Sequence, residues 1–166
     1  MDFELEKKRR LSSQIPLRAA VVCAYVIRRD TNQFLLLKRQ SRYMYGLWQQ
    51  VAGGIEEGES AVQAILREIR EETGHPPRNL YSADIIESFY EVKFNVIEMI
   101  PVFVAEFDTS KTVILSVEHS EYKWVSALEA REHANFAQQR KSIEIIEHEF
   151  ILKTPEPHLK IEFTAP

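Results

Sequence analysis

The chain has 166 residues, of which 45% are hydrophobic and 28% are charged. That size and composition suit one compact domain with a substantial core and leave little room for two. The formal net charge of −4 argues against a broad electrostatic surface for nucleic acid or for an anionic membrane.

The N-terminal residues 1–16 are rich in Glu, Lys and Arg and end at Pro16, so we expect a loosely held arm or a short helix. They lack the apolar stretch of a secretory signal, and no apolar run approaches the roughly 20 residues that span a bilayer. The single Cys23 lies in an apolar run, which predicts a buried thiol that forms no internal disulfide. A cytoplasmic protein follows as the expectation.

Strand-like and helix-like segments then follow along the chain. Two apolar runs separated by a turn-like tetrapeptide predict a β-hairpin, and a shorter strand then runs into a Gly53-Gly54 turn. The predicted strands are 17–28, 34–37, 47–51, 85–92, 97–107, 113–116 and 122–125. The predicted helices are 60–73, 126–132 and 138–152. Residues 154–166 contain three prolines, and we expect them to lie over the surface. Strands mixed with a few helices predict an α/β fold around a mixed β-sheet.

The predicted helix 60–73 carries the most specific pattern in the chain. Ser60 can cap its start, and Gly74 stands just after its end, where a left-handed backbone is often required. At about 100° per residue, one side of the helix is apolar, and three acids gather on a neighbouring arc. These acids are Glu68, Glu71 and Glu72. An acidic face is ordinarily just solvated, but because this arc borders the apolar side, we expect the acids to point toward an edge or a cleft.

The spacing of these acids is suited to a divalent cation. Glu68 and Glu72 are one turn apart, a like-charge pair that destabilises a helix by about 0.2–0.5 kcal/mol unless a cation joins it. Mg²⁺ prefers oxygen ligands from a few carboxylates, water and phosphate. The Gly53-Gly54 pair lets the backbone approach a metal or a phosphate closely. Glu59 and Arg67 can pair and hold the loop against the helix, which favours a structural role for Arg67 over a catalytic one.

The complete segment resembles the box of the Nudix family, a signature of Gly, Glu, Arg-Glu, Glu-Glu and Gly at fixed gaps. The matching residues are Gly53, Glu59, Arg67, Glu68, Glu71, Glu72 and Gly74. His75 departs from the pattern, because the family usually has an apolar residue there. The resemblance implies an α/β/α sandwich around a mixed β-sheet at 17–152, with 1–16 as an arm and 153–166 as a tail. It also implies a Mg²⁺ cofactor, with Mn²⁺ possible, and hydrolysis of a nucleoside diphosphate linked to another group.

The resemblance also implies roles for single residues. Glu68 and Glu72 would be metal ligands, Glu71 a third, and the backbone near Ala52 and Gly53 would lie close to the ion. Glu68 is one candidate for the acid that takes a proton from water, and Arg67 stands in the catalytic part of the box. The structural members would be Glu59, Gly53, Gly54 and Gly74.

Substrate contacts must come from outside the box. Glu118, in the stretch 117–124, is a candidate for a distal metal ligand, and this stretch resembles the branch with dATP pyrophosphohydrolase and dihydroneopterin triphosphate pyrophosphatase. Arg39 can pair with a phosphate, or form a surface salt bridge instead. Trp48 can stack on a base or a pterin, or belong to the core. Tyr43, Tyr45 and His119 are weaker candidates for substrate contacts.

The first functional expectation is a pyrophosphohydrolase that cleaves a (deoxy)nucleoside triphosphate or a pterin triphosphate to a monophosphate and pyrophosphate. One alternative is a dinucleoside polyphosphate or RNA 5′-end pyrophosphohydrolase, for which Tyr90 is a faint similarity. An alternative of another class is a non-catalytic nucleotide-binding or sensing protein, against which the intact box acids argue. We expect a small-molecule partner, no membrane, no extended nucleic-acid surface, and a monomer or a homodimer.

Overall fold

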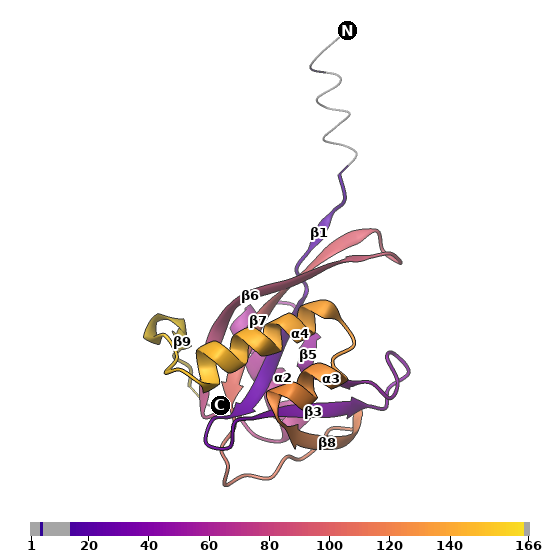
Figure 1. Ribbon diagram of the computed structural model, residues 1–166. Helices are drawn as coiled ribbons and strands as arrows, with labels where there is room; N and C mark the ends of the chain where they lie inside the picture. The colour runs from indigo at the N-terminus through magenta and orange to yellow at the C-terminus, as the bar shows by residue number, and fades with distance from the viewer. Residues whose placement is uncertain (1–3, 5–13, 165–166) are drawn as a thin grey trace.

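The computed structural model describes residues 4 and 14–164 (Figure 1). Most of the predicted N-terminal arm, residues 1–3 and 5–13, therefore lies outside the described residues. In the part that is described, no helix has the length and apolar character needed to cross a membrane. The elements in chain order are β1 (Leu17–Arg18), β2 (Val21–Arg28), β3 (Gln33–Arg39), β4 (Trp48–Gln49), β5 (Val51–Gly54), α2 (Ala61–Thr73), β6 (Asn79–Glu91), β7 (Val96–Glu106), β8 (His119–Val125), α3 (Ala127–His133), α4 (Ala137–Ile146), the π-helical turn η1 (Glu147–Ile151), the 3-10 turn η2 (Pro157–Leu159) and β9 (Lys160–Ile161).

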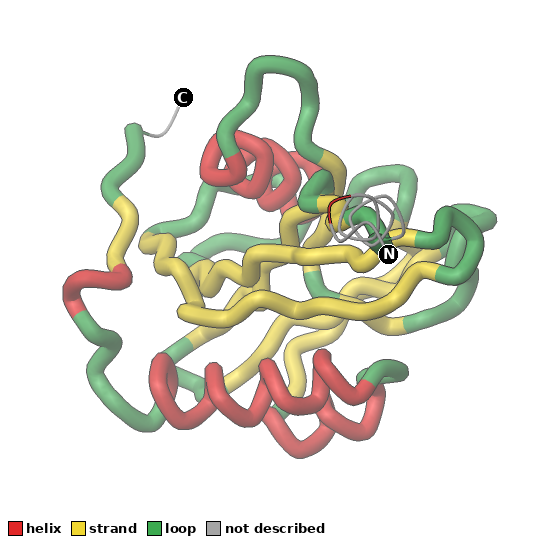
Figure 2. The backbone as a smooth tube through the Cα atoms, turned by 90° about the horizontal axis from the view of Figure 1, so that it is seen from above, coloured by secondary structure: helices red, strands yellow, loops and turns green. Residues whose placement is uncertain are grey.

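The sheet is mixed, as predicted. Strand β2 lies at its centre and pairs antiparallel with β3 and β5 and parallel with β7. Strand β6 continues the sheet antiparallel to β7, and β8 pairs with β3 at the other side. Figure 2 shows helices on both sides of the strands. The predicted α/β/α sandwich is confirmed.

Two apolar cores separate the sheet from its helices, because neighbouring side chains of β2 and β3 point to opposite faces. The α2-side core contains Ala64, Ile65 and Ile69 of α2 against alternate residues of the sheet, among them Val22, Ala24, Val26, Leu35, Leu37 and Val51. The α4-side core contains Ile143 and Ile146 of α4 and Ala127 and Ala130 of α3 against Cys23, Tyr25, Ile27, Phe34 and Leu36. Cys23 is buried in the α4-side core, which confirms the prediction for its thiol.

Helix α2 has the boundaries that the sequence predicts. The Ser60 side chain accepts from the Gln63 N–H, and the Gln63 side chain accepts from the Ser60 N–H, which forms a capping box. Gly74 follows the helix with φ 82°, and its N–H donates to the Arg70 carbonyl. His75, which departs from the box, packs edge-on against Phe107 at 6.0 Å between ring centroids.

Several of the predicted elements are wrong or incomplete. Residues 113–116 form a loop and not a strand, because the Ile114 N–H donates to the Thr73 carbonyl at the end of α2 instead of to a neighbouring strand. Gly53 and Gly54 are not a turn but the end of β5, paired with β2. The last predicted helix changes at Ile146 from α4 to the π-helical turn η1.

Strand β1 is separate from β2 and pairs with β7, so the predicted first strand is broken near Ala19. The C-terminal segment is more ordered than expected, since β9 pairs with β6 at Leu80. Ile161 and Phe163 are partly buried against the α2-side core. This segment therefore contacts the same core as α2.

Candidate active site

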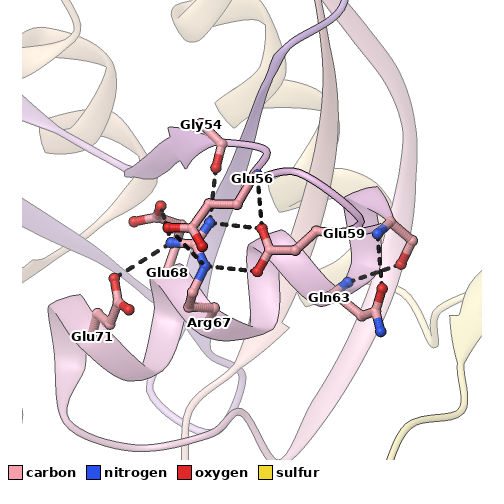
Figure 3. Close-up of polar contacts among 8 residues, drawn as sticks. Gly54, Glu56, Glu59, Gln63, Arg67, Glu68 and Glu71 are labelled. Carbon is pink, nitrogen blue, oxygen red and sulfur yellow. Dashed lines mark hydrogen bonds and ion pairs between the residues drawn. The ribbon is translucent and has the colours of Figure 1, made fainter.

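Arg67 and Glu59 form the central ion pair of the site (Figure 3). Arg67 Nε donates to Glu59 Oε1 at 2.8 Å, and Nη2 donates to Glu59 Oε2 at 2.9 Å and to the Gly54 carbonyl at 2.8 Å. The bonds from Arg67, followed by one from the Glu56 backbone, lower the pKa of Glu59 to about 2. The predicted pairing of loop and helix is confirmed, and the arginine joins three segments of chain.

Glu68 lies directly against the backbone of β5. Arg67 Nη1 donates to Glu68 Oε1 at 2.6 Å, and a methyl group at Gly53 would stand 2.0 Å from the Glu68 Cδ. Real Cβ contacts are never that short, so a side chain at this position would displace the carboxylate. Burial raises the pKa of Glu68, and its bond with Arg67 partly offsets this. The glycine is therefore needed for close approach and not for a turn.

Glu72 is the buried acid of the site. Its exposed fraction is 3%, and its Oε2 has no hydrogen-bond partner among the described residues. Burial is the main cause that raises its pKa to about 9, and the charges of Glu68 and Glu118 add to the effect. Arg39 and the Ala52 backbone act in the opposite direction. A buried carboxyl group near two other carboxylates fits a bound cation.

Glu71 differs from its two neighbours. Its side chain is 55% exposed, and its contact is an ion pair with Arg67 Nη1 at 3.5 Å. The three helix acids are therefore not equivalent, because Glu72 faces the sheet, Glu68 borders β5 and Glu71 faces outward. For Glu71 the role of metal ligand stays a prediction.

Arg39 and Glu118 come from β3 and from the loop before β8. Arg39 Nη2 lies 3.7 Å from Glu118 Oε2, and Arg39 Nε donates to the Tyr43 carbonyl at 2.9 Å. Both residues act electrostatically on Glu72, which places them beside α2. His119 is buried next to them, and its pKa is lowered by burial and by Arg39 while Glu118 opposes this.

Trp48 is not part of the same group. It packs against the α4-side core, on the face of the sheet opposite α2. The Lys123 ammonium lies 4.3 Å from its ring centroid, and the His133 ring lies at 6.0 Å. Tyr43 and Tyr45 are exposed. Base stacking by Trp48 stays a prediction, and Lys123 already occupies part of the ring surface.

The donor set fits Mg²⁺ or Mn²⁺, since it consists of carboxylate and backbone oxygens. The unpartnered Glu72 Oε2 and the space that Gly53 leaves beside Glu68 are the two structural observations in favour of this fit. Within residues 4 and 14–164, no three His, Cys, Asp or Glu side chains are already grouped as metal ligands. In this arrangement Glu68 is bonded to Arg67.

Two features of the site could not be found by sequence reasoning. The contact of Arg67 with the Gly54 carbonyl depends on how the loop folds over α2, and no periodicity encodes it. Lys123 and His133 lie around Trp48, with Lys123 Nζ 2.5 Å from His133 Nε2. For Lys123 the only signal was the alternation of the predicted strand 122–125, and His133 follows the predicted helix 126–132.

Known proteins resemble this chain in sequence and in fold. A sequence profile described as the NUDIX domain matches residues 16–144. The chain is 32% identical over 131 residues to the asymmetrical bis(5′-nucleosyl)-tetraphosphatase of Mus musculus, a match that covers 76% of this chain and 85% of that protein. It is 28% identical over 141 residues to an octanoyltransferase of Myxococcus xanthus, covering 81% of this chain but only 38% of that longer relative.

Solved structures share the fold. The MutT protein of Methanosarcina mazei Go1 superposes with a TM-score of 0.67 at 29% identity, over 82% of this chain and 96% of that one. The E. coli dihydroneopterin triphosphate pyrophosphohydrolase superposes with a TM-score of 0.68 at 24% identity, over 84% of this chain and 99% of that one. At this identity the second likeness concerns the fold alone.

Proposed function

The chain belongs to the Nudix hydrolase family, and on that premise we propose that it is a Mg²⁺-dependent pyrophosphohydrolase. Its substrate would be a (deoxy)nucleoside triphosphate or a pterin triphosphate, cleaved to a monophosphate and pyrophosphate. The observation that carries this proposal is the buried Glu72, with an unpartnered oxygen and two carboxylates acting on it. A cation bound together with a phosphate chain would supply the partner that this Glu72 oxygen lacks.

We assign the cation ligands to Glu68 and Glu72, with Glu118 and Glu71 as further carboxylates and the backbone of Gly53 nearby. When bound, the cation neutralises phosphate oxygens and makes water more acidic. Within the box Arg67 holds Glu68 by one bond and Glu59 by two, so it fixes the carboxylate beside β5. Glu68 is the candidate that accepts the proton of the attacking water.

The phosphate chain would lie between the α2 carboxylates and Arg39. Arg39 offers a guanidinium that matches a phosphate in shape and charge, and its Glu118 contact at 3.7 Å is long enough to be exchanged for a phosphate. The backbone of Ala52 lies on the same side, where its hydrogen bond acts on Glu72. Trp48, on the other face of the sheet, would contact the base or pterin at the far end of the substrate.

A second candidate is hydrolysis of a dinucleoside polyphosphate or of an RNA 5′ end. The observation in its favour is the match to the mouse tetraphosphatase over most of both chains. Tyr90, the faint similarity in sequence, lies exposed on the β6–β7 hairpin, and its hydroxyl donates to Asn95 Oδ1 at 2.8 Å. That bond gives Tyr90 a local role in the hairpin and adds no support.

A candidate of another class is a protein that binds nucleotides without hydrolysing them. The retained carboxylates count against it, because a family member that only binds nucleotides would be expected to have lost carboxylates of the box. Kinetics decide between these candidates.

The test is a substrate panel with Mg²⁺ that contains dNTPs, NTPs, dihydroneopterin triphosphate, diadenosine tetraphosphate, a 5′-triphosphate RNA and ADP-ribose. Pyrophosphate release from a triphosphate, lost in Glu72→Gln and Glu68→Gln, would support the first candidate. Preference for diadenosine tetraphosphate or RNA would select the second. No turnover of any compound by the wild type, with unchanged Mg²⁺ binding in both variants, would refute the enzyme proposal.

A further inference from the structure

His119 stands out among the buried polar residues of the protein. It begins β8, its exposed fraction is 3%, and neither ring nitrogen has a hydrogen-bond partner among the described residues. An imidazole carries at least one N–H donor in either protonation state, and a buried donor without a partner lowers the stability of the fold. The protein therefore keeps a destabilising group at this position.

Most other buried polar groups of the described residues are bonded; the exceptions besides His119 are Glu72 Oε2 and Gln49 Nε2, each with one unpartnered atom. Thr73 donates to the Ile69 carbonyl at 2.6 Å, and Glu87 accepts from Tyr25 and from Ser142 at 2.8 and 2.7 Å. Some side chains have one unpartnered atom but are bonded through a second atom of the same group. These are Arg28, Arg29, Glu98 and Glu106. For His119 both polar atoms are unpartnered.

A local irregularity sets the place of this ring. Along β3 and β8 the pairing runs from Phe34↔Val125 to Lys38↔Glu121, and the next pair is Arg39↔His119 because Ser120 is skipped. Without this bulge, Arg39 would stand opposite Ser120. Bulges commonly re-aim side chains next to active sites. Here the bulge brings the imidazole opposite the arginine that we assign to the phosphate chain.

The charged groups around the ring belong to the same site. Arg39 and Glu118 are the charges that act on His119, and both also act on Glu72. Like His119, Glu72 keeps a buried atom without a partner. Two unpartnered groups, one a donor and one a carboxylate oxygen, thus share the surroundings of one arginine. A phosphate chain with a bound cation complements both groups, because its negative oxygens can accept from His119 and its cation can bind the Glu72 oxygen.

We infer that His119 is a substrate-binding residue that donates a ring N–H to an oxygen of the phosphate chain held between Arg39 and the carboxylates of α2. The inference rests on the proposed function, since it requires a phosphate chain at that place. It adds a contact from β8 that lies outside the box. If His119 instead stabilised the fold, its ring nitrogens would already have hydrogen-bond partners within the protein, and replacing it would lower the stability of the folded state.

The test compares His119→Leu, which removes both nitrogens at similar size, with His119→Asn, which keeps a donor. The matched control is His75→Leu, since His75 Nε2 has a partner in the Thr112 carbonyl at 3.0 Å and the residue is outside the proposed contacts. Thermal unfolding with EDTA and no nucleotide measures the role in the fold. Binding of inorganic tripolyphosphate with Mg²⁺, followed by calorimetry, and kcat/KM on the best substrate of the panel measure the role in binding.

We expect His119→Leu to unfold at the same temperature as the wild type or higher, because it loses no internal hydrogen bond. Tripolyphosphate affinity and kcat/KM should both fall about 10- to 100-fold, as for one hydrogen bond to a charged group. His119→Asn should recover part of both losses, and His75→Leu should retain the affinity.

A clearly lower unfolding temperature in His119→Leu, or its failure to fold, would overturn the inference by giving the ring a structural role. Wild-type affinity and turnover in a folded His119→Leu would overturn it as well, as would a wild type that does not bind tripolyphosphate. If the wild type binds tripolyphosphate but hydrolyses no compound of the panel, the proposed function fails and the affinity comparison still decides the role of His119.

Discussion

Replacing Glu72 by Gln tests the buried acid through stability alone. In the folded protein the pKa of Glu72 is about 9, against an ordinary value of 4.5, so the folded state keeps a proton that the unfolded chain releases. The folded state therefore binds more protons, and stability falls as pH rises from about 4.5 toward 9. At about 1.4 kcal/mol per pH unit, the loss at pH 7 is at most about 3 kcal/mol, or roughly 6–12 °C in Tm for a chain of this size.

Gln cannot ionise, so Glu72→Gln removes this part of the pH dependence. In EDTA the variant should match the wild type near pH 4.5 and exceed its Tm near pH 7. Adding Mg²⁺ should reverse the order, because the cation stabilises the ionised wild type by mass action and the variant less. Differential scanning calorimetry over this pH range measures both effects.

The control is Glu144→Gln, an exposed helical glutamate of α4. It should leave the pH dependence as in the wild type. If Glu72→Gln and the wild type lose stability with the same slope between pH 4.5 and 7, Glu72 does not hold a proton in the folded protein. The reasoning on burial and neighbouring charge would then be refuted.

Three further substitutions test other contacts. Gly53→Ala should displace the Glu68 carboxylate, since the added methyl would stand 2.0 Å from its Cδ. Mg²⁺ affinity should then fall about 10-fold in a titration. The Tm should change little, because only the end of a flexible side chain moves. Unchanged Mg²⁺ affinity would contradict it. Gly74→Ala should lower the free energy of unfolding, measured in urea, by about 1–3 kcal/mol. The reason is that φ at this position is 82° and the added methyl would lie 2.6 Å from the Ile114 Cβ. An unaltered urea midpoint would count against this. Trp48→Leu should raise KM for a nucleoside triphosphate more than for inorganic tripolyphosphate, which lacks a base; equal changes for both would remove Trp48 from base binding.

The helix of the box was predictable because its signals are local. The cap at Ser60, the left-handed Gly74 and the apolar period of α2 all act within a few residues, and the structure has each of them. The Glu59–Arg67 pair also followed from local reasoning, since Glu59 lies just before α2 and Arg67 lies on that helix eight residues further along the chain.

The arrangement of the acids was not predictable to the same degree. Helix phase put Glu68, Glu71 and Glu72 on one arc, but burial depends on which strands lie against that arc. Strand β5 covers Glu68 through Gly53, while Glu71 is left 55% exposed. Such long-range packing leaves no periodic trace in the sequence.

The position of Trp48 relative to Arg39 was not predictable either, and its contact with a base stays a prediction. A tryptophan close in sequence to Arg39 was expected beside the same ligand, yet alternation along the strands sends the two side chains to opposite faces of the sheet. A substrate that touches both must therefore pass around the edge of the sheet. That requirement sets a minimum length for the molecule.

The C-terminal segment covers an edge of strand β6 that could otherwise pair with other chains. Strand β9 occupies the backbone groups of β6 near Leu80, and Ile161 covers part of the α2-side core. An uncovered strand edge is a template for pairing with other chains, so a protein shortened to residues 17–152 should aggregate at concentrations where the full chain stays dispersed. We therefore expect residues well outside the Nudix box to contribute to the solubility of this protein.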